Sequence, residues 1–332
     1  MEAMLYEKGV GNVRCRLCAR RCVIADGKRG VCGVRENRGG VLMTLVYGKA
    51  ASCAVDPIEK KPLFHFHPGT KALSVSTVGC NFRCLFCDNW SISQPDEIFG
   101  DPLSPEEIVS LAKRTGCRSI SYTYTEPTVF FEYAHDTARL AKKEGIFNTF
   151  VTNGYMTPEA VEVISPYLDA ATVDFKGSGD PSFYRAFCGV PDASPVFDAL
   201  LEMKRRKIFI EVTNLIVPGG GDIKSPFLKL SGWIRDSLGA ETPYHILRFF
   251  PSYLWSGSDP LPHNAMEEFW KMARREGLSH VYLGNMPGGS FENTVCPSCG
   301  NVVIERCGFE VLSLNLKGNA CSWCGRALNV VA

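Results

Sequence analysis

The sequence contains no apolar run that could cross a bilayer, because no stretch approaches the roughly eighteen apolar residues that a membrane-spanning helix needs. Residues 1–8 carry neither a basic segment nor an apolar core, so we expect no secretory signal peptide. The sequence also lacks an excess of positive or negative charge. The formal net charge of +1 at pH 7 provides no overall attraction for nucleic acid or anionic lipid. These absences predict a cytoplasmic protein that binds neither membranes nor nucleic acid.

A phosphate-binding loop is missing as well, because no Lys-Ser or Lys-Thr pair follows the glycine run at 219–221 at the position that such a loop requires. Cysteine, in contrast, is abundant, with 15 in 332 residues, and most of these fall in three groups. In a reducing compartment, grouped cysteines indicate metal or redox chemistry rather than disulfides. With 45% hydrophobic and 21% charged residues, the composition is typical of a globular enzyme with one large domain and appendages, or with two domains.

The central cysteine group has the spacing C-x3-C-x2-C and consists of Cys80, Cys84 and Cys87. Three thiolates on one short loop can hold three irons of a [4Fe–4S] cluster and leave the fourth iron without a protein ligand. A cluster used only for electron transfer normally takes four cysteines, so the open iron indicates a binding site for a substrate or cofactor. A structural zinc knuckle with a distant fourth ligand is the alternative. It is less favoured because zinc-binding pairs usually have the spacing C-x2-C.

The N-terminal group has the spacing C-x2-C-x3-C-x9-C and consists of Cys15, Cys18, Cys22 and Cys32. Four thiolates are enough to close a tetrahedral zinc site or to hold a second, auxiliary iron–sulfur cluster, and the spacing does not choose between them. Reduced thiols without metal are the remaining alternative. Basic residues between the ligands would offset the negative charge of a tetrathiolate centre, and these are Arg16, Arg20 and Arg21.

The C-terminal group consists of two C-x2-C pairs about twenty residues apart, formed by Cys296, Cys299, Cys321 and Cys324. This spacing predicts a zinc-ribbon or rubredoxin-like site and favours zinc over iron. The segment has few basic residues, so a structural or partner-docking role is expected rather than contact with nucleic acid. Cys307 stands outside the pairs and is not expected to be a ligand.

Between these groups the chain alternates short β-branched or aromatic runs with amphipathic stretches. Helix starts are recognisable, for example at Ser104-Pro105, where a capping box is followed by proline at the first helical position. Alternating strands and helices predict an α/β fold with a parallel sheet and right-handed crossovers, here a partial (β/α)6 TIM-like barrel. The predicted strands are 72–78, 119–124, 148–152, 171–175, 208–217 and 244–250. The predicted division is 1–70 for a Cys-rich segment, 71–285 for the barrel and 286–332 for the zinc-ribbon-like segment.

In such barrels the functional side chains gather at the carboxyl ends of the strands. The cysteine loop follows the first predicted strand, and polar residues end the later ones. These candidate residues are Glu126, Asn153, Asp174, Lys176, His245 and Arg248. Two further histidines, His65 and His67, lie in an aromatic run and are expected to be packing residues.

The cysteine loop resembles the signature of the radical S-adenosylmethionine (SAM) superfamily. The resemblance implies that SAM chelates the open iron through its amino and carboxylate groups. It further implies that the reduced cluster cleaves SAM to a 5′-deoxyadenosyl radical, which removes a hydrogen atom from the substrate. Phe86 matches the aromatic residue that packs near the adenine in that family. No catalytic residue is expected beyond the cluster itself.

The resemblance extends to the ends of the strands, in the branch of the family that resembles glycyl-radical activases. Glu126, in the sequence Thr-Glu-Pro, stands where relatives pair a backbone edge with the SAM ammonium group, although the usual glycines are absent here. The resemblance also implies that Asn153 contacts the ribose side of SAM and that Asp174 and Lys176 lie near its methionine moiety. From the sixth strand, it implies that His245 and Arg248 face the active centre.

The whole chain resembles the radical SAM component of the AmmeMemoRadiSam system. This resemblance is carried by the N-terminal cysteine element, by the loop DPIEKKP at 56–62 and by the Cys-Pro-x-Cys-Gly knuckle that begins at Cys296. It implies AMMECR-type and Memo-type partners and a low-potential electron donor. Three hypotheses follow: a radical modification within that system, activation of a glycyl radical enzyme as in pyruvate formate-lyase activating enzymes, and a non-catalytic iron–sulfur scaffold or electron carrier.

Overall fold

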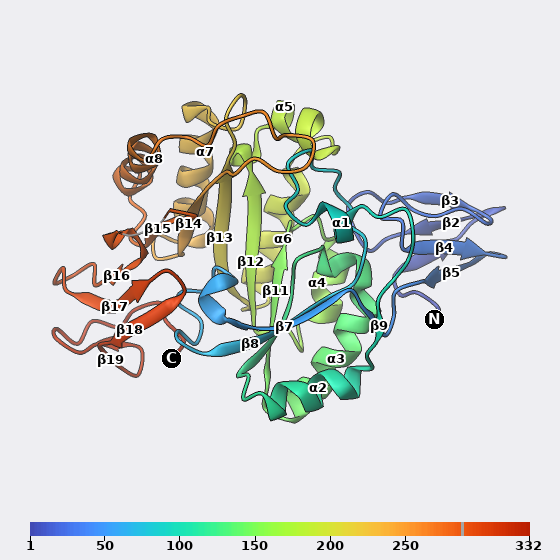
Figure 1. Cartoon of the computed structure of the whole chain (residues 1–332), viewed down its shortest axis with the longest axis horizontal. Coiled ribbons are helices and arrows are strands. Elements are labelled where there is room, and N and C mark those ends of the chain that lie inside the picture. Colours follow the sequence, from blue (N-terminus) through green and yellow to red (C-terminus); the bar gives the residue numbers. More distant parts are fainter. Residues whose placement is uncertain (287–288) are drawn as a thin grey trace.

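One large sheet organises the fold in the computed structural model of the chain, which describes residues 1–286 and 289–332 (Figure 1). In these residues the sheet has eight strands in the order β15-β14-β13-β12-β11-β10-β8-β7. All neighbours from β8 to β15 are parallel, and β7 pairs antiparallel with β8 at the edge. The bounds are β7 Ser52–Pro57, β8 Lys71–Ser76, β10 Ser119–Tyr122, β11 Phe147–Thr152, β12 Ala170–Lys176, β13 Phe209–Ile216, β14 Tyr244–Arg248 and β15 Val281–Gly284.

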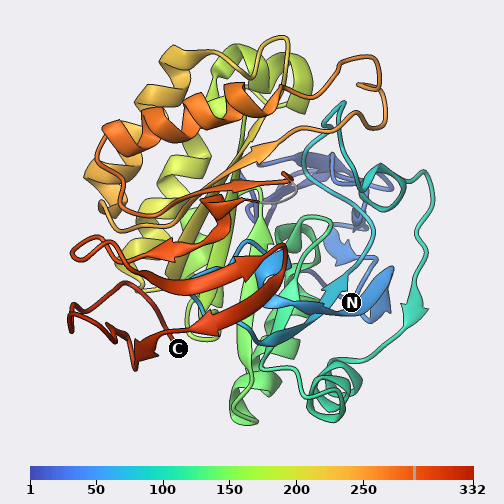
Figure 2. The ribbon, with the colours of Figure 1, turned by 60° about the vertical axis from the view of Figure 1, so that its left-hand side comes forward.

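Helices connect the parallel strands and cover one face of the sheet (Figures 1 and 2). The predicted capping box is confirmed, because Ser104 Oγ accepts from the Glu107 N–H and Glu107 Oε2 accepts from the Ser104 N–H. The helices are α1 Trp90–Ser93, α2 Pro105–Arg114, α3 Phe131–Lys143, α4 Pro158–Ile164, α5 Pro181–Phe183, α6 Ser194–Arg205, α7 Lys224–Trp233 and α8 His263–Arg275. Within residues 1–286 and 289–332, none of the helices combines the length and the hydrophobicity that a membrane-spanning helix requires.

The two faces of the sheet differ in chemistry, as the strand β12 shows. Phe175 points to the helices, since its ring lies 5.0 Å from that of Phe197 in α6. Side chains alternate along a strand, so the neighbours Asp174 and Lys176 point to the opposite face. That face carries the Asp174–Lys176 pair.

The α/β fold is confirmed, and the six predicted strands correspond to β8 and β10–β14. Two strands of the sheet lie outside the six predicted barrel strands. β15 has only four residues, too short for a clear pattern, and β7 comes from the N-terminal segment and pairs antiparallel with the first barrel strand. The sheet therefore continues across the predicted division at residue 70.

Smaller sheets form the two terminal segments, which lie at opposite ends of the long axis of the molecule (Figure 1). The predicted C-terminal segment begins at residue 286, and its residues 287 and 288 lie outside the described residues. The N-terminal strands are β1 Tyr6–Lys8, β2 Asn12–Cys15, β3 Val23–Ala25, β4 Arg35–Arg38, β5 Val41–Thr44 and β6 Lys49–Ala50. The short strand β9 Asp101–Pro102 pairs with β6. The C-terminal strands are β16 Thr294–Val295, β17 Val302–Cys307, β18 Glu310–Leu314, β19 Leu316–Lys317 and β20 Ala320–Cys321.

Candidate functional site

The cysteine loop, residues 79–90, follows the carboxyl end of β8. The start of this loop packs closely against the N-terminal segment. Gly79 has φ = +99°, and a Cβ atom there would lie 2.5 Å from Val34 Cγ1 and 2.9 Å from the Cys32 carbonyl oxygen. Only glycine combines that conformation with so close an approach. The Gly79 N–H donates to the Ile92 carbonyl oxygen over 2.9 Å, which joins the start of the loop to α1.

Two of the three thiols of the loop, those of Cys80 and Cys87, lie within hydrogen-bond distance of neighbouring groups. The Phe82 N–H donates to Cys80 Sγ over 3.4 Å, and the Ser93 hydroxyl lies 3.2 Å from Cys87 Sγ. Burial raises the pKa of the Cys80 thiol well above its ordinary value, so a metal is needed to hold it as a thiolate. In the described residues, the sulfurs of Cys80, Cys84 and Cys87 do not all lie within 4.8 Å of one another. Three thiols at this wider spacing fit an iron–sulfur cluster, because the irons and sulfides of the cluster occupy the space between the thiolates.

The buried Glu126 connects the ends of β10 and β11 to this loop. Its Oε1 accepts from the Thr152 hydroxyl over 2.7 Å and from the Thr128 N–H over 3.0 Å. Its Oε2 accepts from the Asn153 N–H over 2.8 Å, and Asn153 Nδ2 donates to Asn81 Oδ1 over 2.7 Å. The carboxylate therefore positions Asn153 beside the cysteine loop, where Nδ2 lies 3.9 Å from Cys80 Sγ.

Asp174 and Lys176 form an ion pair at the end of β12, with 2.6 Å between Oδ2 and Nζ. The Thr213 hydroxyl donates to Asp174 Oδ1 over 2.8 Å and fixes the carboxylate. Burial lowers the pKa of Lys176, but the negative charge of Asp174 and the Cys84 thiolate outweigh it and raise that pKa well above its ordinary value. The position of Lys176 beside the cysteine loop and the direction of this shift suit it to hold a carboxylate.

Phe86 is buried against two aromatic rings, with centroids 5.7 Å from Phe183 and 6.5 Å from Phe249. Cys188, which belongs to none of the three cysteine groups, lies here too. Its hydrogen bond to the Cys84 thiol is the main cause that raises the pKa of Cys84, and its carbonyl oxygen accepts from the Arg83 N–H over 2.9 Å. A lone cysteine 101 residues after Cys87 has no spacing pattern, so the sequence held no indication of this contact.

His245 and Arg248 have other observed contacts. His245 Nε2 lies 2.7 Å from Glu211 Oε2, and its ring meets the edge of Phe64 at 4.7 Å. Arg248 Nε donates to the Leu261 carbonyl oxygen over 2.6 Å. Both residues are thus held by the protein itself, and their predicted contact with the cofactor remains a prediction.

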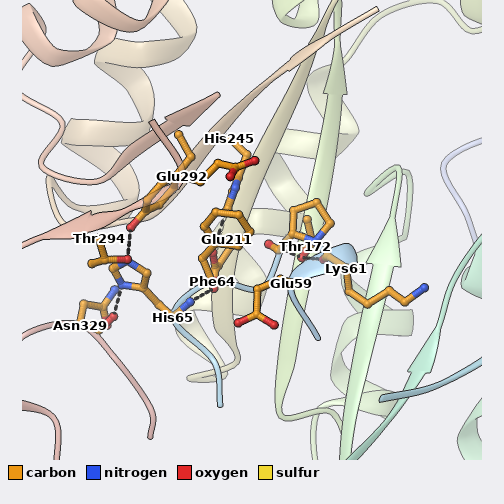
Figure 3. Close-up of polar contacts among 12 residues, drawn as sticks. Glu59, Lys61, Phe64, His65, Thr172, Glu211, His245, Glu292, Thr294 and Asn329 are labelled. Carbon is orange, nitrogen blue, oxygen red and sulfur yellow. Dashed lines mark hydrogen bonds and ion pairs between the residues drawn. The ribbon is translucent and has the colours of Figure 1, made fainter. Parts of the chain in front are cut away.

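A loop between β7 and β8, residues 58–70, lies across the polar face of the sheet; we call it the inserted loop (Figure 3). The Thr172 hydroxyl donates to the Lys61 carbonyl oxygen over 2.7 Å, and the His65 N–H donates to Glu211 Oε1 over 2.7 Å. His65 and His67 are buried, as expected for packing residues, and the loop opens with a 3-10 turn at Ile58–Lys60. The inserted loop fills the barrel at the amino ends of the strands, so the carboxyl ends carry the candidate site.

A buried ion pair anchors the inserted loop to β7, with Asp56 Oδ2 2.7 Å from Lys61 Nζ. The Ser74 hydroxyl and the Tyr124 hydroxyl also donate to Asp56. Burial raises the pKa of Asp56, but its hydrogen-bond donors outweigh this effect and hold the pKa well below its ordinary value. Burial lowers the pKa of Lys61 to about 8, against the attraction of Asp56.

The two outer cysteine groups are each brought together by the fold. In the C-terminal group, Cys296 Sγ lies 3.6 Å from Cys324 Sγ, and Cys299 Sγ lies 3.7 Å from Cys321 Sγ. All four sulfurs lie within 4.8 Å of one another, so this group can hold one metal ion. The N-terminal four line a common cavity together with Asn81 of the cysteine loop.

Comparison with known proteins agrees with this geometry. Residues 74–234 match the radical SAM superfamily. The uncharacterized protein MJ0808 of Methanocaldococcus jannaschii is 46% identical over 335 residues, which cover 99% of each chain. The pyruvate formate-lyase 1-activating enzyme of Escherichia coli (strain K12) is 26% identical over 181 residues, which cover 51% of this chain and 72% of that enzyme.

Among solved structures, Streptococcus suis SuiB bound to precursor peptide SuiA matches with a TM-score of 0.52 and 13% identity, over 69% of this chain and 51% of SuiB. At this identity the match shows a shared fold.

Proposed function

Since the chain belongs to the radical SAM superfamily, whose members are SAM-cleaving enzymes, we propose that it holds a [4Fe–4S] cluster through Cys80, Cys84 and Cys87 and cleaves SAM there. The observation that carries the proposal is the set of thiols at the carboxyl end of β8, spaced too widely for one metal ion and beside the Asp174–Lys176 pair. When bound, the cluster supplies one electron to the sulfonium of SAM, and the resulting 5′-deoxyadenosyl radical removes a hydrogen atom from the substrate.

The residues of this chain bind and orient SAM in the proposed complex. Lys176 offers a fixed cation for the carboxylate of SAM, and Asp174 keeps that cation charged. Asn153, positioned by Glu126, offers its amide toward the ribose side. Phe86 provides an apolar wall for the adenine, and Phe183 and Phe249 keep it in place.

We further propose that the radical reaction is a modification within the AmmeMemoRadiSam system, in the cytoplasm, with AMMECR-type and Memo-type partners and a low-potential electron donor. The support is the resemblance of the whole chain, including both outer cysteine groups and the inserted loop. Activation of a glycyl radical enzyme is the second candidate, favoured by the similarity to the E. coli activating enzyme. That similarity covers 51% of this chain.

Anaerobic reconstitution tests the proposed chemistry. The protein is loaded with iron and sulfide, reduced with dithionite and supplied with SAM, and 5′-deoxyadenosine is quantified with and without the two partners. Product is expected from the wild type and from the control Cys53→Ala, which replaces an exposed cysteine outside the three groups. The variant Cys80→Ala/Cys84→Ala/Cys87→Ala should give none. Product from that variant would refute the cluster assignment.

Two readouts separate the candidate reactions. A radical modification within the system predicts a mass change on a partner or on a small molecule bound to it. Glycyl radical activation instead predicts a stable organic radical in the electron paramagnetic resonance (EPR) spectrum of a large partner protein. Lys176→Met should keep its iron and raise the SAM concentration for half-maximal cleavage by about tenfold or more, since loss of an ion pair of about 1.4 kcal/mol weakens binding tenfold. An unchanged value would remove Lys176 from the site.

A further inference from the structure

The N-terminal cysteines enclose more space than a single metal ion needs. Zinc–sulfur bonds of about 2.3 Å in a tetrahedron place the thiolates about 3.8 Å apart. The C-terminal group has that spacing, with sulfur pairs at 3.6 and 3.7 Å. In the described part of the chain, no three sulfurs among Cys15, Cys18, Cys22 and Cys32 all lie within 4.8 Å of one another. The same chain thus contains one closed and one open group of four thiols.

A cavity of about 20 Å³ lies between the four N-terminal cysteines, and Leu17, Ile24 and Val129 also line it. A cavity needs roughly 10–15 Å³ to hold one water, so a cavity of about 20 Å³ shows that the four thiols do not close on one another. A closed zinc site would leave no room of this kind, because its thiolates touch one another around the ion. An iron–sulfur cube needs such a space, since its irons and sulfides lie between the thiolates.

Two buried N–H donors at this cavity lack partners. Arg35 is 2% exposed and Asn81 is 0% exposed, and both residues line the cavity. Arg35 Nε and Asn81 Nδ2 have no hydrogen-bond acceptor among the described residues. Buried polar groups are normally paired, so each unpaired donor indicates an acceptor that completes the site. The sulfides and thiolates of an anionic cluster are acceptors of this kind.

From these observations we propose that Cys15, Cys18, Cys22 and Cys32 bind a second [4Fe–4S] cluster, with all four irons held by protein. Arg35 balances part of the negative charge, and Asn81 donates from the cysteine loop. Four protein ligands leave no open iron, so this cluster does not bind SAM. The assignment rests on the thiol geometry and is independent of SAM cleavage at the first cluster.

The second cluster lies against the first cysteine loop. The Arg20 Nε donates to the Asn81 carbonyl oxygen over 2.9 Å. The Arg83 guanidinium donates to the Cys80 carbonyl oxygen over 2.8 Å and also to the carbonyl oxygen of Val31, next to the ligand Cys32. Polar contacts thus connect the ligand loops of the two clusters directly.

The test uses the variant Cys80→Ala/Cys84→Ala/Cys87→Ala, which keeps the N-terminal cysteines. After anaerobic reconstitution, iron, sulfide and zinc are measured per chain. The variant should hold about four irons and the wild type about eight, each with about one zinc at the C-terminal group. A variant with no iron, with two irons or with a second zinc would overturn the proposal.

Spectroscopy provides a second readout that does not depend on activity. Reduced with dithionite, the variant should show the EPR signal of a [4Fe–4S]+ cluster, and added SAM should leave that signal unchanged. A signal shifted by SAM would mean an open iron and would contradict four protein ligands. The complementary variant Cys15→Ser/Cys18→Ser/Cys22→Ser/Cys32→Ser should lose about four irons relative to the wild type. If this variant does not fold, the first variant still decides the question.

Discussion

The two outer cysteine groups have the same number of thiols and opposite geometry. The C-terminal four are closed to the spacing of a single metal ion and lie on a small sheet, with Cys299 and Cys324 exposed. The N-terminal four surround a cavity and pack against the cysteine loop of the candidate active site. The number of cysteine ligands therefore does not identify the metal. The metal is selected by the distances that the backbone sets between the thiols and by the groups that surround them.

A buried arginine accompanies each group, with a different task in each case. Arg35 lies 3.1 Å from Glu132 and lines the N-terminal cavity. Arg306 of β17 reaches away from its cysteines into the inserted loop, where it donates to the Phe64 carbonyl oxygen over 2.6 Å and lies 3.8 Å from Glu59. The first arginine lines the proposed metal site, and the second fastens the C-terminal segment to the inserted loop.

The largest effect is expected from Cys321→Ser, which opens the closed group. Structural zinc contributes about 10–16 kcal/mol of binding free energy in small zinc domains, so its loss should unfold the C-terminal sheet. Zinc should fall from about one per chain to near zero, and protease sites should appear within 289–332, while iron content stays unchanged. The control is Cys307→Ser, an exposed cysteine of β17 outside the two C-x2-C pairs, which should keep zinc and change stability by less than about 0.5 kcal/mol. Zinc retained in Cys321→Ser would contradict the assignment of this group.

Arg306→Met should lower the free energy of unfolding by about 3–5 kcal/mol, because it leaves the Glu59 carboxylate buried without a cation. Urea unfolding under anaerobic conditions measures the change. Zinc and iron contents should remain as in the wild type. The double variant Arg306→Met/Glu59→Gln should recover a large part of the loss; if it is no more stable than the single variant, the ion pair is not the cause.

Arg35→Met/Glu132→Gln removes the corresponding pair at the open group while keeping net charge. Glu132 Oε1 accepts from the Met4 N–H, and glutamine keeps that acceptor. Without the nearby cation, the reduction potential of the second cluster should fall by on the order of tens of millivolts, since local charge and hydrogen bonds set this potential. EPR-monitored redox titration in the Cys80→Ala/Cys84→Ala/Cys87→Ala background measures it. Arg306→Met is the matched control, and an equal shift there would remove the distinction between the two arginines.

The smallest effect concerns pH at the junction of the C-terminal segment with the barrel. His280 is buried beside His65, with ring centroids 4.6 Å apart, and burial lowers the pKa of His280 to about 4. The folded state then binds fewer protons than the unfolded state between pH 4 and the ordinary histidine value near 6.5. The contribution of His280 to the free energy of unfolding is fully present above about pH 6.5. Below that pH it should fall by about 1 kcal/mol per pH unit. Urea unfolding at pH 7 and pH 5.5 should show a smaller loss for His280→Gln; equal losses would remove His280 as the cause.

Much of the fold was predictable because its indications are local. The six strands β8 and β10–β14 were visible as apolar runs, and the start of α2 was visible in the residues that cap it. The inserted loop was less predictable. Its burial depends on contacts such as that of His65 with Glu211, which lies 146 residues away in the sequence.

The candidate site divides in the same way. The ligand cysteines and the Asp174–Lys176 pair could be recognised, because each set lies within one short segment of chain. The contact between Cys188 and Cys84 could not be recognised, since their proximity arises only when the loop after β12 packs on the loop after β8. Contact of Glu126, Asn153, His245 and Arg248 with SAM stays a prediction, and the structure provides the internal contacts that position each of them.

The sequence by itself determined the three cysteine groups, the alternation of strands and helices, and the membership of the superfamily. Each of these depends on residues close together in the chain, where spacing alone limits what the residues can bind or form. Tertiary structure alone decided the distance between the N-terminal thiols, the unpaired donors of Arg35 and Asn81 beside them, and the reach of Arg306 into the barrel. These depend on packing between segments far apart in the sequence, because a metal site is selected by distances in space and by the groups that enclose it.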